Sequence, residues 1–366
     1  MWAKYTAVFS RRMTDFHPLT VREVRRETAD CVSILLAPRP EDAERFRFTA
    51  GQYLTLRTEL DGAEVRRSYS ICTAPASGEL RVAVKRVPEG RFSTWANAHL
   101  APGDVLEAMA PAGRFTHVPQ PARPLHHVGF AAGSGITPVL GILETVLQEE
   151  PESTFTLFYV NKDAQSVIFK ERLHDLKDRF LGRLRLFHLL TREPMELELF
   201  HGRLDKDRCT RILNSGLLPA GEIGAAWLCG PESMITDCRD ALREAGVPED
   251  RVHFELFTSA GSATKTVSSA PATGTEVAIV LDGITTTVRL EGTRSILDAA
   301  LDAGLDAPYS CLGGVCCTCR ARMTSGKAEM AINYALEPRE VEQGFILTCQ
   351  ARPVGEGPFV VDYDQQ

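Results

Sequence analysis

The first third of the chain, from Leu19 to about Val118, alternates hydrophobic and polar residues over short stretches separated by turn residues. Such alternation places every second side chain on one face of a β-strand. The pair Asp61-Gly62 lies between two of these stretches and is a strong hairpin signal. Repeated short strands at this spacing predict a small antiparallel β-barrel over residues 17–120. The alternating positions are Val32, Ile34 and Leu36, then Leu54 and Leu56, then Leu80, Val82 and Val84.

The pattern changes at Val128, where apolar strands begin to alternate with amphipathic helices. This alternation predicts a parallel α/β sheet, with ligands at the carboxyl ends of its strands. We expect this domain to span residues 123–258. Its predicted strands are 127–132, 154–160, 184–190 and 225–228, and its predicted helices start at Pro138, span 167–180 and end at Glu244.

The last third begins after residues 259–275, which are rich in Ser, Thr, Ala and Gly and predict a flexible linker. Beyond it the pattern indicates a third domain over residues 276–363 that mixes strands with short helices. Its predicted elements are a hairpin at Asp282-Gly283, a helix that Ser295 caps and Gly304 ends, a short helix near Val341 and a strand over 345–348.

Composition narrows the class of protein. A chain that is 44% hydrophobic and 24% charged is typical of a soluble globular protein, and its net charge of −7 argues against a nucleic-acid partner. No run approaches the roughly 20 apolar residues of a membrane helix. Ser10-Arg11-Arg12 faintly resembles a twin-arginine signal, but no apolar segment follows it. We therefore expect a cytoplasmic protein with no membrane partner, and cysteines kept as thiols in a reducing compartment agree with this.

Cysteine spacing gives the strongest chemical signal. Four cysteines follow the pattern C-x4-C-x2-C, with 29 further residues before the last, and this is the spacing of a plant-type [2Fe–2S] site. A zinc site would more often use paired C-x2-C motifs, and a disulfide framework suits short secreted chains. Gly313 and Gly314 allow the loop to turn sharply, whereas Cys317 does not fit the spacing and is expected to point away. The predicted cluster ligands are Cys311, Cys316, Cys319 and Cys349.

Three segments of the first domain carry groups that suit a flavin. In Arg67-Ser68-Tyr69-Ser70 an arginine can hold a phosphate, an aromatic ring can stack on a planar ring and a serine can bond its edge. Residues 90–94 predict a helix start whose amides suit a second phosphate. By itself Arg-x-Tyr-Ser more often indicates cross-strand packing. The third segment is Pro111-Ala112-Gly113-Arg114-Phe115.

Two glycine turns follow strands of the second domain. Residues 133–138 read Gly-Ser-Gly-Ile-Thr-Pro, in which Thr137 is a good N-cap and Pro138 a good first helical residue. Cys229-Gly230-Pro231 forms the second turn, and such turns present free amides to a pyrophosphate. Arg192, after Thr191 at a third strand end, could pair with a 2′-phosphate, although a solvated surface arginine explains it equally well.

The three segments of the first domain, in this order, resemble the flavin domain of the ferredoxin–NADP reductase family. The resemblance implies that Arg67 meets the flavin pyrophosphate, Tyr69 lies on the isoalloxazine ring and Ser70 sits near its reactive nitrogen. FAD is favoured over FMN because the members nearest in motif and domain order use it, and the residues alone leave that choice open. The other expected flavin-binding residues are Val84, Lys85, Gly90, Phe92, Ser93 and Thr94.

The glycine turns resemble the pyridine-nucleotide domain of the same family, where such turns border the nicotinamide and its pyrophosphate. Thr191-Arg192 matches its NADPH-preferring members, so we favour NADPH, with NADH as the alternative. Phe254-Glu255-Leu256-Phe257 resembles the family's F-E-x-F end, which would make Glu255 catalytic together with Tyr69 and Ser70; a plain edge strand fits nearly as well. The expected nucleotide-binding residues are Gly133, Ser134, Gly135, Thr137, Pro138, Thr191, Arg192, Cys229, Gly230 and Pro231.

The third domain resembles plant-type ferredoxins, which are α+β proteins with a β-grasp sheet. NAD(P)H gives up two electrons as a hydride and a [2Fe–2S] cluster accepts one, so a flavin is needed between them. This order of domains resembles the reductase components of bacterial oxygenases. Among them the chain most resembles the reductase subunits of phenylacetyl-CoA epoxidases, whose partners are diiron oxygenase subunits. The stretches that carry this likeness are Arg67-Ser-Tyr-Ser-Ile-Cys72, Val84-Lys-Arg-Val87 with Gly90-Arg-Phe-Ser-Thr-Trp95, and Gly313-Gly-Val-Cys-Cys-Thr-Cys-Arg320. We expect such a partner to dock around residues 311–319. The alternatives are a reductase for a Rieske or steroid hydroxylase and, in another class, a cluster-based redox sensor.

Overall fold

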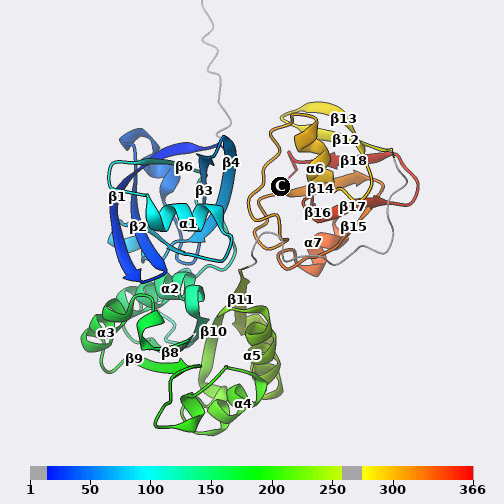
Figure 1. Cartoon of the computed structure of the whole chain (residues 1–366). Helices are drawn as coiled ribbons and strands as arrows, with labels where there is room; N and C mark the ends of the chain where they lie inside the picture. Colours follow the sequence, from blue (N-terminus) through cyan, green and yellow to red (C-terminus); the bar gives the residue numbers. More distant parts are fainter. Residues whose placement is uncertain (1–14, 258–273, 366) are drawn as a thin grey trace, which may run out of the picture.

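A computed structural model describes residues 15–257 and 274–365 of the chain. Three units follow one another along it, and we call them the barrel domain, the parallel-sheet domain and the C-terminal domain (Figure 1). The predicted linker over 259–275 lies almost entirely outside the described residues.

The barrel domain is a six-stranded antiparallel sheet in the order β4-β3-β6-β1-β2-β5. A bridge between Ile71 and Val82 brings its two edges together, so the sheet curls into the predicted barrel. Asp61 and Gly62 both have positive φ and form the predicted hairpin turn. The elements are β1 (His17–Thr28), β2 (Cys31–Pro38), β3 (Tyr53–Leu60), β4 (Ala63–Ser70), β5 (Leu80–Lys85), α1 (Arg91–Ala98) and β6 (Val105–Ala108).

The parallel-sheet domain has five strands in the order β11-β10-β7-β8-β9, and every pair of neighbours is parallel. Two buried clusters cover its faces, one with helices α2 and α3 and the other with α4 and α5. The elements are β7 (His126–Ala132), α2 (Ile136–Glu149), β8 (Thr154–Asn161), α3 (Lys170–Arg179), β9 (Leu184–Leu190), α4 (Lys206–Asn214), β10 (Ile223–Gly230), α5 (Glu232–Glu244) and β11 (Val252–Leu256).

Three local predictions in this domain are corrected by the structure. The N-cap of α2 is Gly135, not Thr137, because the 3₁₀ turn Gly133–Gly135 runs directly into the helix. The helix predicted over 167–180 starts only at Lys170, since Phe169 before it has a left-handed φ of 60°. Helix α4 was not predicted, although Asp205 caps it with its carboxylate.

The C-terminal domain pairs a mixed sheet, in the order β13-β12-β18-β14-β16, with helix α6. Strands β12 and β18 are parallel at its centre, which agrees with the expected β-grasp fold. Ser295 caps α6 as predicted. The elements are β12 (Thr275–Leu281), β13 (Ile284–Leu290), α6 (Ile296–Asp302), β14 (Arg320–Ser325), β15 (Lys327–Met330), α7 (Pro338–Glu342), β16 (Phe345–Leu347), β17 (Ala351–Val354) and β18 (Phe359–Asp362).

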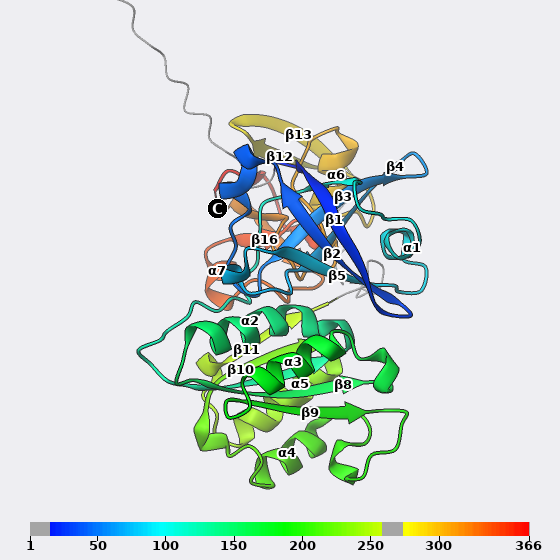
Figure 2. The same ribbon diagram turned by 90° about the vertical axis from the view of Figure 1, so that its left-hand side faces the viewer.

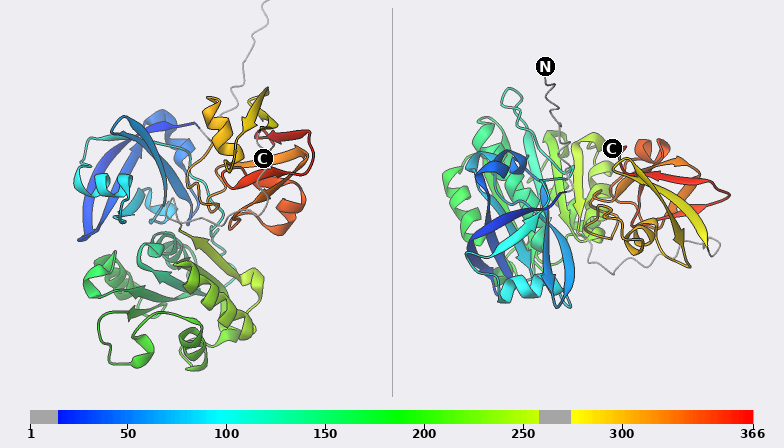
Figure 3. Two further views of the ribbon diagram at one scale, coloured as in Figure 1. Left: turned by 45° about the vertical axis from the view of Figure 1, so that its right-hand side comes forward. Right: turned by 90° about the horizontal axis from the view of Figure 1, so that it is seen from above.

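The domains pack against one another. Helix α2 lies under one end of the barrel (Figure 2), and the amide of Ala74 donates to the carboxylate of Glu144 across that boundary, at 3.4 Å. The C-terminal domain stands beside the barrel (Figure 3), where Ser68 and Ser310 hydroxyls lie 2.6 Å apart. The barrel domain therefore contacts both of the other domains.

Candidate functional site

The cysteine loop folds so that its thiols form two pairs. Cys311 interacts with Cys316, and Cys319 interacts with Cys349. Leu312 and Gly314 both adopt positive φ, which turns the loop back on itself. The Gly313 amide donates to the Cys311 sulfur at 3.3 Å. The hydrogen bond with the Cys316 thiol, helped by backbone amides that include Gly313, lowers the pKa of the Cys311 thiol to about 6, and the same pairing raises the pKa of Cys316.

This donor set fits a binuclear iron–sulfur cluster. Two pairs of thiols supply one pair for each iron, and a thiolate is the form that binds the metal. All ten cysteines are free thiols in the structure. Cys317, with a φ of 55°, instead lines a cavity of about 380 Å³ together with Arg114 and Arg320.

The predicted flavin residues lie around the end of β4 and the start of α1. The ring of Tyr69 lies 5.4 Å from that of Phe92, centroid to centroid. No side chain caps α1 at Gly90, which leaves its first amides for a phosphate. Ser93 is buried and its hydroxyl donates to the Gly90 carbonyl, which fixes the loop. These residues fit a flavin phosphate.

The remaining predicted flavin residues differ in exposure. Val84 is fully buried in the barrel core, so only its backbone can face a ligand. Lys85 is mostly buried, with its ammonium 3.8 Å from Asp30, and Thr94 is exposed. Arg67 lies part-buried at the same end of the barrel as Ser70.

Ser70 and Glu255, predicted from separate domains, are hydrogen-bonded. The Ser70 hydroxyl donates to Glu255 at 3.1 Å, joining β4 to β11. Burial raises the pKa of the Glu255 carboxyl to about 8, so it is neutral at physiological pH. A hollow of about 100 Å³ joins this pair to the cysteine loop, and it is lined by Tyr53, Arg67, Phe257, Cys311 and Cys316 among others.

The two glycine turns of the parallel-sheet domain touch. A Cβ added at Gly135 would collide with the Cys229 carbonyl and would lie 2.9 Å from the Gly230 nitrogen. The Tyr159 hydroxyl donates to the carbonyl of Gly133 at 3.0 Å and holds the first turn. Because the two turns pack so closely at the carboxyl ends of β7 and β10, their free amides face the same region, and such an arrangement suits a pyrophosphate.

The remaining predicted nucleotide residues are placed at the same edge of the sheet. Thr137 donates to the carbonyl of Ser134 at 3.0 Å, and Pro138 is buried in the first turn of α2. Pro231 directly precedes α5. Thr191 and the exposed Arg192 follow β9, with their amides bonded to the carbonyls of Asn161 and Lys162.

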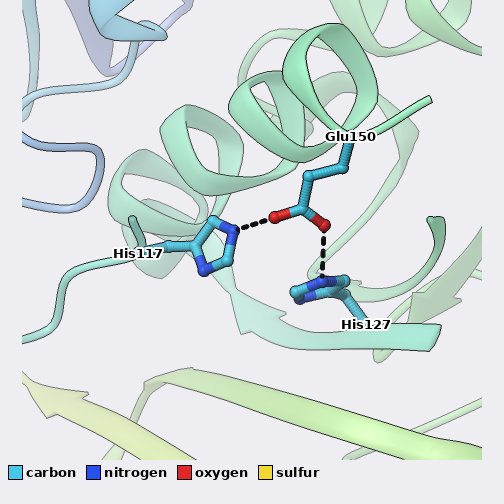
Figure 4. Close-up of side chains that lie close together, drawn as sticks. All are labelled: His117, His127 and Glu150. Carbon is cyan, nitrogen blue, oxygen red and sulfur yellow. Dashed lines mark hydrogen bonds and ion pairs between the residues drawn. The ribbon is translucent and has the colours of Figure 1, made fainter. Parts of the chain in front are cut away.

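A buried polar cluster was not anticipated from the sequence. Glu150 accepts hydrogen bonds from His117 at 2.7 Å and from His127 at 3.3 Å (Figure 4). The Trp227 indole donates to the other nitrogen of His127 at 3.2 Å, so the proton of this imidazole faces Glu150. The cluster is therefore a hydrogen-bonded link between the end of the barrel domain and the C-terminal end of α2. No motif surrounds these residues that could have revealed it.

Comparisons with known proteins agree with this geometry. Residues 19–117 match an oxidoreductase FAD-binding domain, residues 130–240 an oxidoreductase NAD-binding domain and residues 279–354 a 2Fe-2S iron-sulfur cluster binding domain. The structure resembles that of phthalate dioxygenase reductase, with a TM-score of 0.61 and 24% identity over 95% of this chain and 98% of that one. The fold and the site thus define a modular flavin and iron–sulfur reductase.

Relatives that align over nearly the whole chain show which kind of reductase this is. One subunit of the 1,2-phenylacetyl-CoA epoxidase of Escherichia coli K12 is 43% identical over 96% of this chain and 99% of its own length. The ferredoxin reductase component of 3-ketosteroid-9-alpha-monooxygenase from Mycolicibacterium smegmatis is 37% identical over 95% and 97%. The chain belongs to this family of oxygenase reductase components.

The chain is accordingly an NAD(P)H-dependent oxidoreductase that uses FAD and a [2Fe–2S] cluster to deliver electrons to an oxygenase. FAD supplies the chemistry that converts the electron pair of a hydride into single electrons. The protein binds and orients the reacting groups and keeps Glu255 protonated beside Ser70. Among residues 15–257 and 274–365, no helix is long and apolar enough to cross a membrane.

Proposed function

We propose that this chain passes electrons from NADPH to the diiron oxygenase of a phenylacetyl-CoA epoxidase system. The observation that carries the proposal is the 43% identity to the Escherichia coli epoxidase subunit, which extends over 99% of that subunit. Similarity over the whole length includes the surfaces that a shared acceptor would recognise. We also propose a cytoplasmic location, as expected from the sequence.

Reconstitution tests the acceptor. The purified reductase is combined with the oxygenase subunits of a phenylacetyl-CoA epoxidase, and epoxide formation is measured per NADPH oxidised. We expect tightly coupled product formation. NADPH consumption without epoxide would contradict the proposal.

A second acceptor is favoured by the 37% identity to a 3-ketosteroid-9-alpha-monooxygenase reductase component. The same assay with that monooxygenase separates the two, since only one acceptor should give coupled product. The sensor alternative predicts no sustained NADPH oxidation with ferricyanide or cytochrome c, and fast flavin-dependent turnover would eliminate it.

We propose these roles for the predicted residues. Arg67, Tyr69 and the loop 90–94 bind FAD, while residues 133–138 and 229–231 bind the dinucleotide. Cys311, Cys316, Cys319 and Cys349 hold the cluster. The fit of each group to its ligand, described above, supports these roles.

The preference for NADPH depends on Arg192. Its side chain is exposed beyond β9, where a 2′-phosphate can pair with it. Arg192→Ala should raise the KM for NADPH about tenfold and leave that for NADH nearly unchanged. Steady-state kinetics with both nucleotides checks this, and equal changes in the two KM values would contradict the assignment.

A further inference from the structure

The face of the C-terminal domain that carries the cysteine loop is packed against the barrel. The hydroxyl of Tyr53, at the start of β3, donates to the backbone carbonyl of Cys316 and lies 3.3 Å from the Thr318 hydroxyl. Tyr53 is 5% exposed, so this contact is shielded from water. The barrel therefore holds a predicted cluster ligand through that ligand's own backbone.

A buried carboxylate makes a second contact between the barrel and the same face of the C-terminal domain. Glu340, in α7, accepts hydrogen bonds from both terminal guanidinium nitrogens of Arg114, one of them at 2.6 Å, and its carboxylate lies 3.2 Å from the Arg320 guanidinium. The Arg114 guanidinium holds the pKa of the Glu340 carboxyl down at about 2. A paired arrangement of this kind is directional as well as strong.

In a third contact the barrel again supplies the positive charge and the C-terminal domain the negative one. Arg66 of the barrel lies 3.6 Å from Asp306 and stacks over the ring of Tyr309. In both ion pairs the cation belongs to the barrel and the anion to the C-terminal domain. Complementary charges of this kind select one docking orientation.

Tyr53 also lies next to the proposed flavin site. It pairs in register with Ser70 across β3 and β4 and lines the hollow shared with Arg67 and Glu255. The residue that holds the cysteine loop is thus a direct neighbour of the residues that face the flavin. A small displacement at Tyr53 would change the separation of flavin and cluster.

We propose that Tyr53 and Arg114 are positioning residues for flavin-to-cluster electron transfer, because they hold the C-terminal domain in its docked orientation. The inference rests on the electron path stated above and concerns a step before any oxygenase. Electrons leave NADPH as a pair in a hydride and reach the cluster singly. Each NADPH oxidised therefore reduces two molecules of cytochrome c and releases one proton.

The test separates the two half-reactions in the full-length holoenzyme. Anaerobic stopped-flow with NADPH follows flavin and cluster absorbance, and amide hydrogen exchange reports on residues 314–319 and 338–342. Tyr53→Phe and Arg114→Gln should slow cluster reduction on the order of tenfold, with faster exchange in these segments and a much smaller change in flavin reduction. Arg114→Lys keeps the charge and should recover part of the rate.

Arg39→Gln is the matched control. Arg39 is about as exposed as Arg114, at 53% against 48%, and its partner Asp42 is as buried as Glu340, but both lie within the barrel domain. This variant should show wild-type cluster reduction and exchange. Wild-type rates in Tyr53→Phe and Arg114→Gln, or an equal loss of flavin reduction, would overturn the proposal. No oxygenase is present, so an incorrect acceptor assignment leaves the result unchanged.

Discussion

Glu255 is neutral at physiological pH although it is a carboxyl group, and this follows from its position. It lies where three domains meet, and burial raises its pKa to about 8, while the Ser70 hydroxyl bond opposes that rise only in part. Ionisation would place a negative charge beside the proposed flavin site. The protonated form is therefore the one suited to the reaction.

The pH dependence of flavin reduction should reveal this group. We expect the rate of reduction by NADPH to fall as pH rises through about 8, the pKa of Glu255. Glu255→Gln, which stays neutral, should remove this dependence. Stopped-flow flavin reduction between about pH 6 and pH 9.5 is the measurement. A decline of the same size in the variant would exclude Glu255 as its source.

His127 makes a separate contribution to stability. Burial lowers the pKa of its imidazole from 6.5 to about 4, and the neighbouring His117 adds to this, although Glu150 opposes it. His126 and His253 are the other titratable groups nearby, and burial lowers the pKa of both. A depressed histidine pKa means that the unfolded chain takes up the proton first, so stability falls as pH drops below 6.5.

Unfolding at pH 7 and pH 5 tests this. As pH falls from 7 to 5, the titration of His127 alone should lower the free energy of unfolding by about 2 kcal/mol. Glu150→Gln should reduce stability already at pH 7, because it weakens the acceptor of two buried N–H groups. Denaturant titration followed by tryptophan fluorescence measures both. The raised pKa of Glu255 shifts wild-type stability in the opposite direction over the same interval, so the contribution of His127 is read as the difference from a His127→Gln variant. An equal change in stability between pH 7 and pH 5 in both proteins would contradict the argument.

At the scale of elements, periodicity predicted most of the fold. Strand β9 and the end of α5 occur where the sequence placed them, and the two Asp-Gly hairpins have their expected positive φ values. Capping signals gave a wrong helix start where the neighbouring turn sets it, as at α2, which begins after Gly135. Local signals also could not predict the contact of Tyr53 with Cys316, which joins residues 263 positions apart.

The close approach of the two glycine turns belongs to this scale. Gly135→Ala would force its Cβ into the Cys229 carbonyl, which would separate η3 (Gly133–Gly135) from the end of β10. We expect NADPH affinity to fall at least about tenfold and stability to fall by about 1–3 kcal/mol. Nucleotide titration of flavin reduction and thermal unfolding measure these effects. Gly182→Ala, where a Cβ meets nothing within 4 Å, is the control and should change neither.

At the scale of the whole molecule, the three domains converge on one hollow. Ser70, Glu255 and Cys316 line it together, one from each domain, so predicted site residues of all three domains are neighbours there. The barrel covers Cys316, which is 8% exposed, whereas Cys319, 2% exposed, is buried in the core of the C-terminal domain itself. Leu312 is 41% exposed. Part of the surface around residues 311–319, where the sequence led us to expect the oxygenase, is thus covered by the barrel at Cys316 and Thr318, and the side at Leu312 stays open.

Locking this arrangement tests whether the barrel and the oxygenase compete for one surface. Ser68 and Ser310 hydroxyls lie 2.6 Å apart across the boundary, so Ser68→Cys with Ser310→Cys places two thiols in contact. In the disulfide form we expect cluster reduction by NADPH to continue at the wild-type rate and oxygenase-coupled turnover to fall at least about tenfold, with recovery on reduction. Ser310→Cys alone should behave as wild type. Full coupled turnover by the locked form would show that the acceptor reaches the cluster from the exposed side at Leu312.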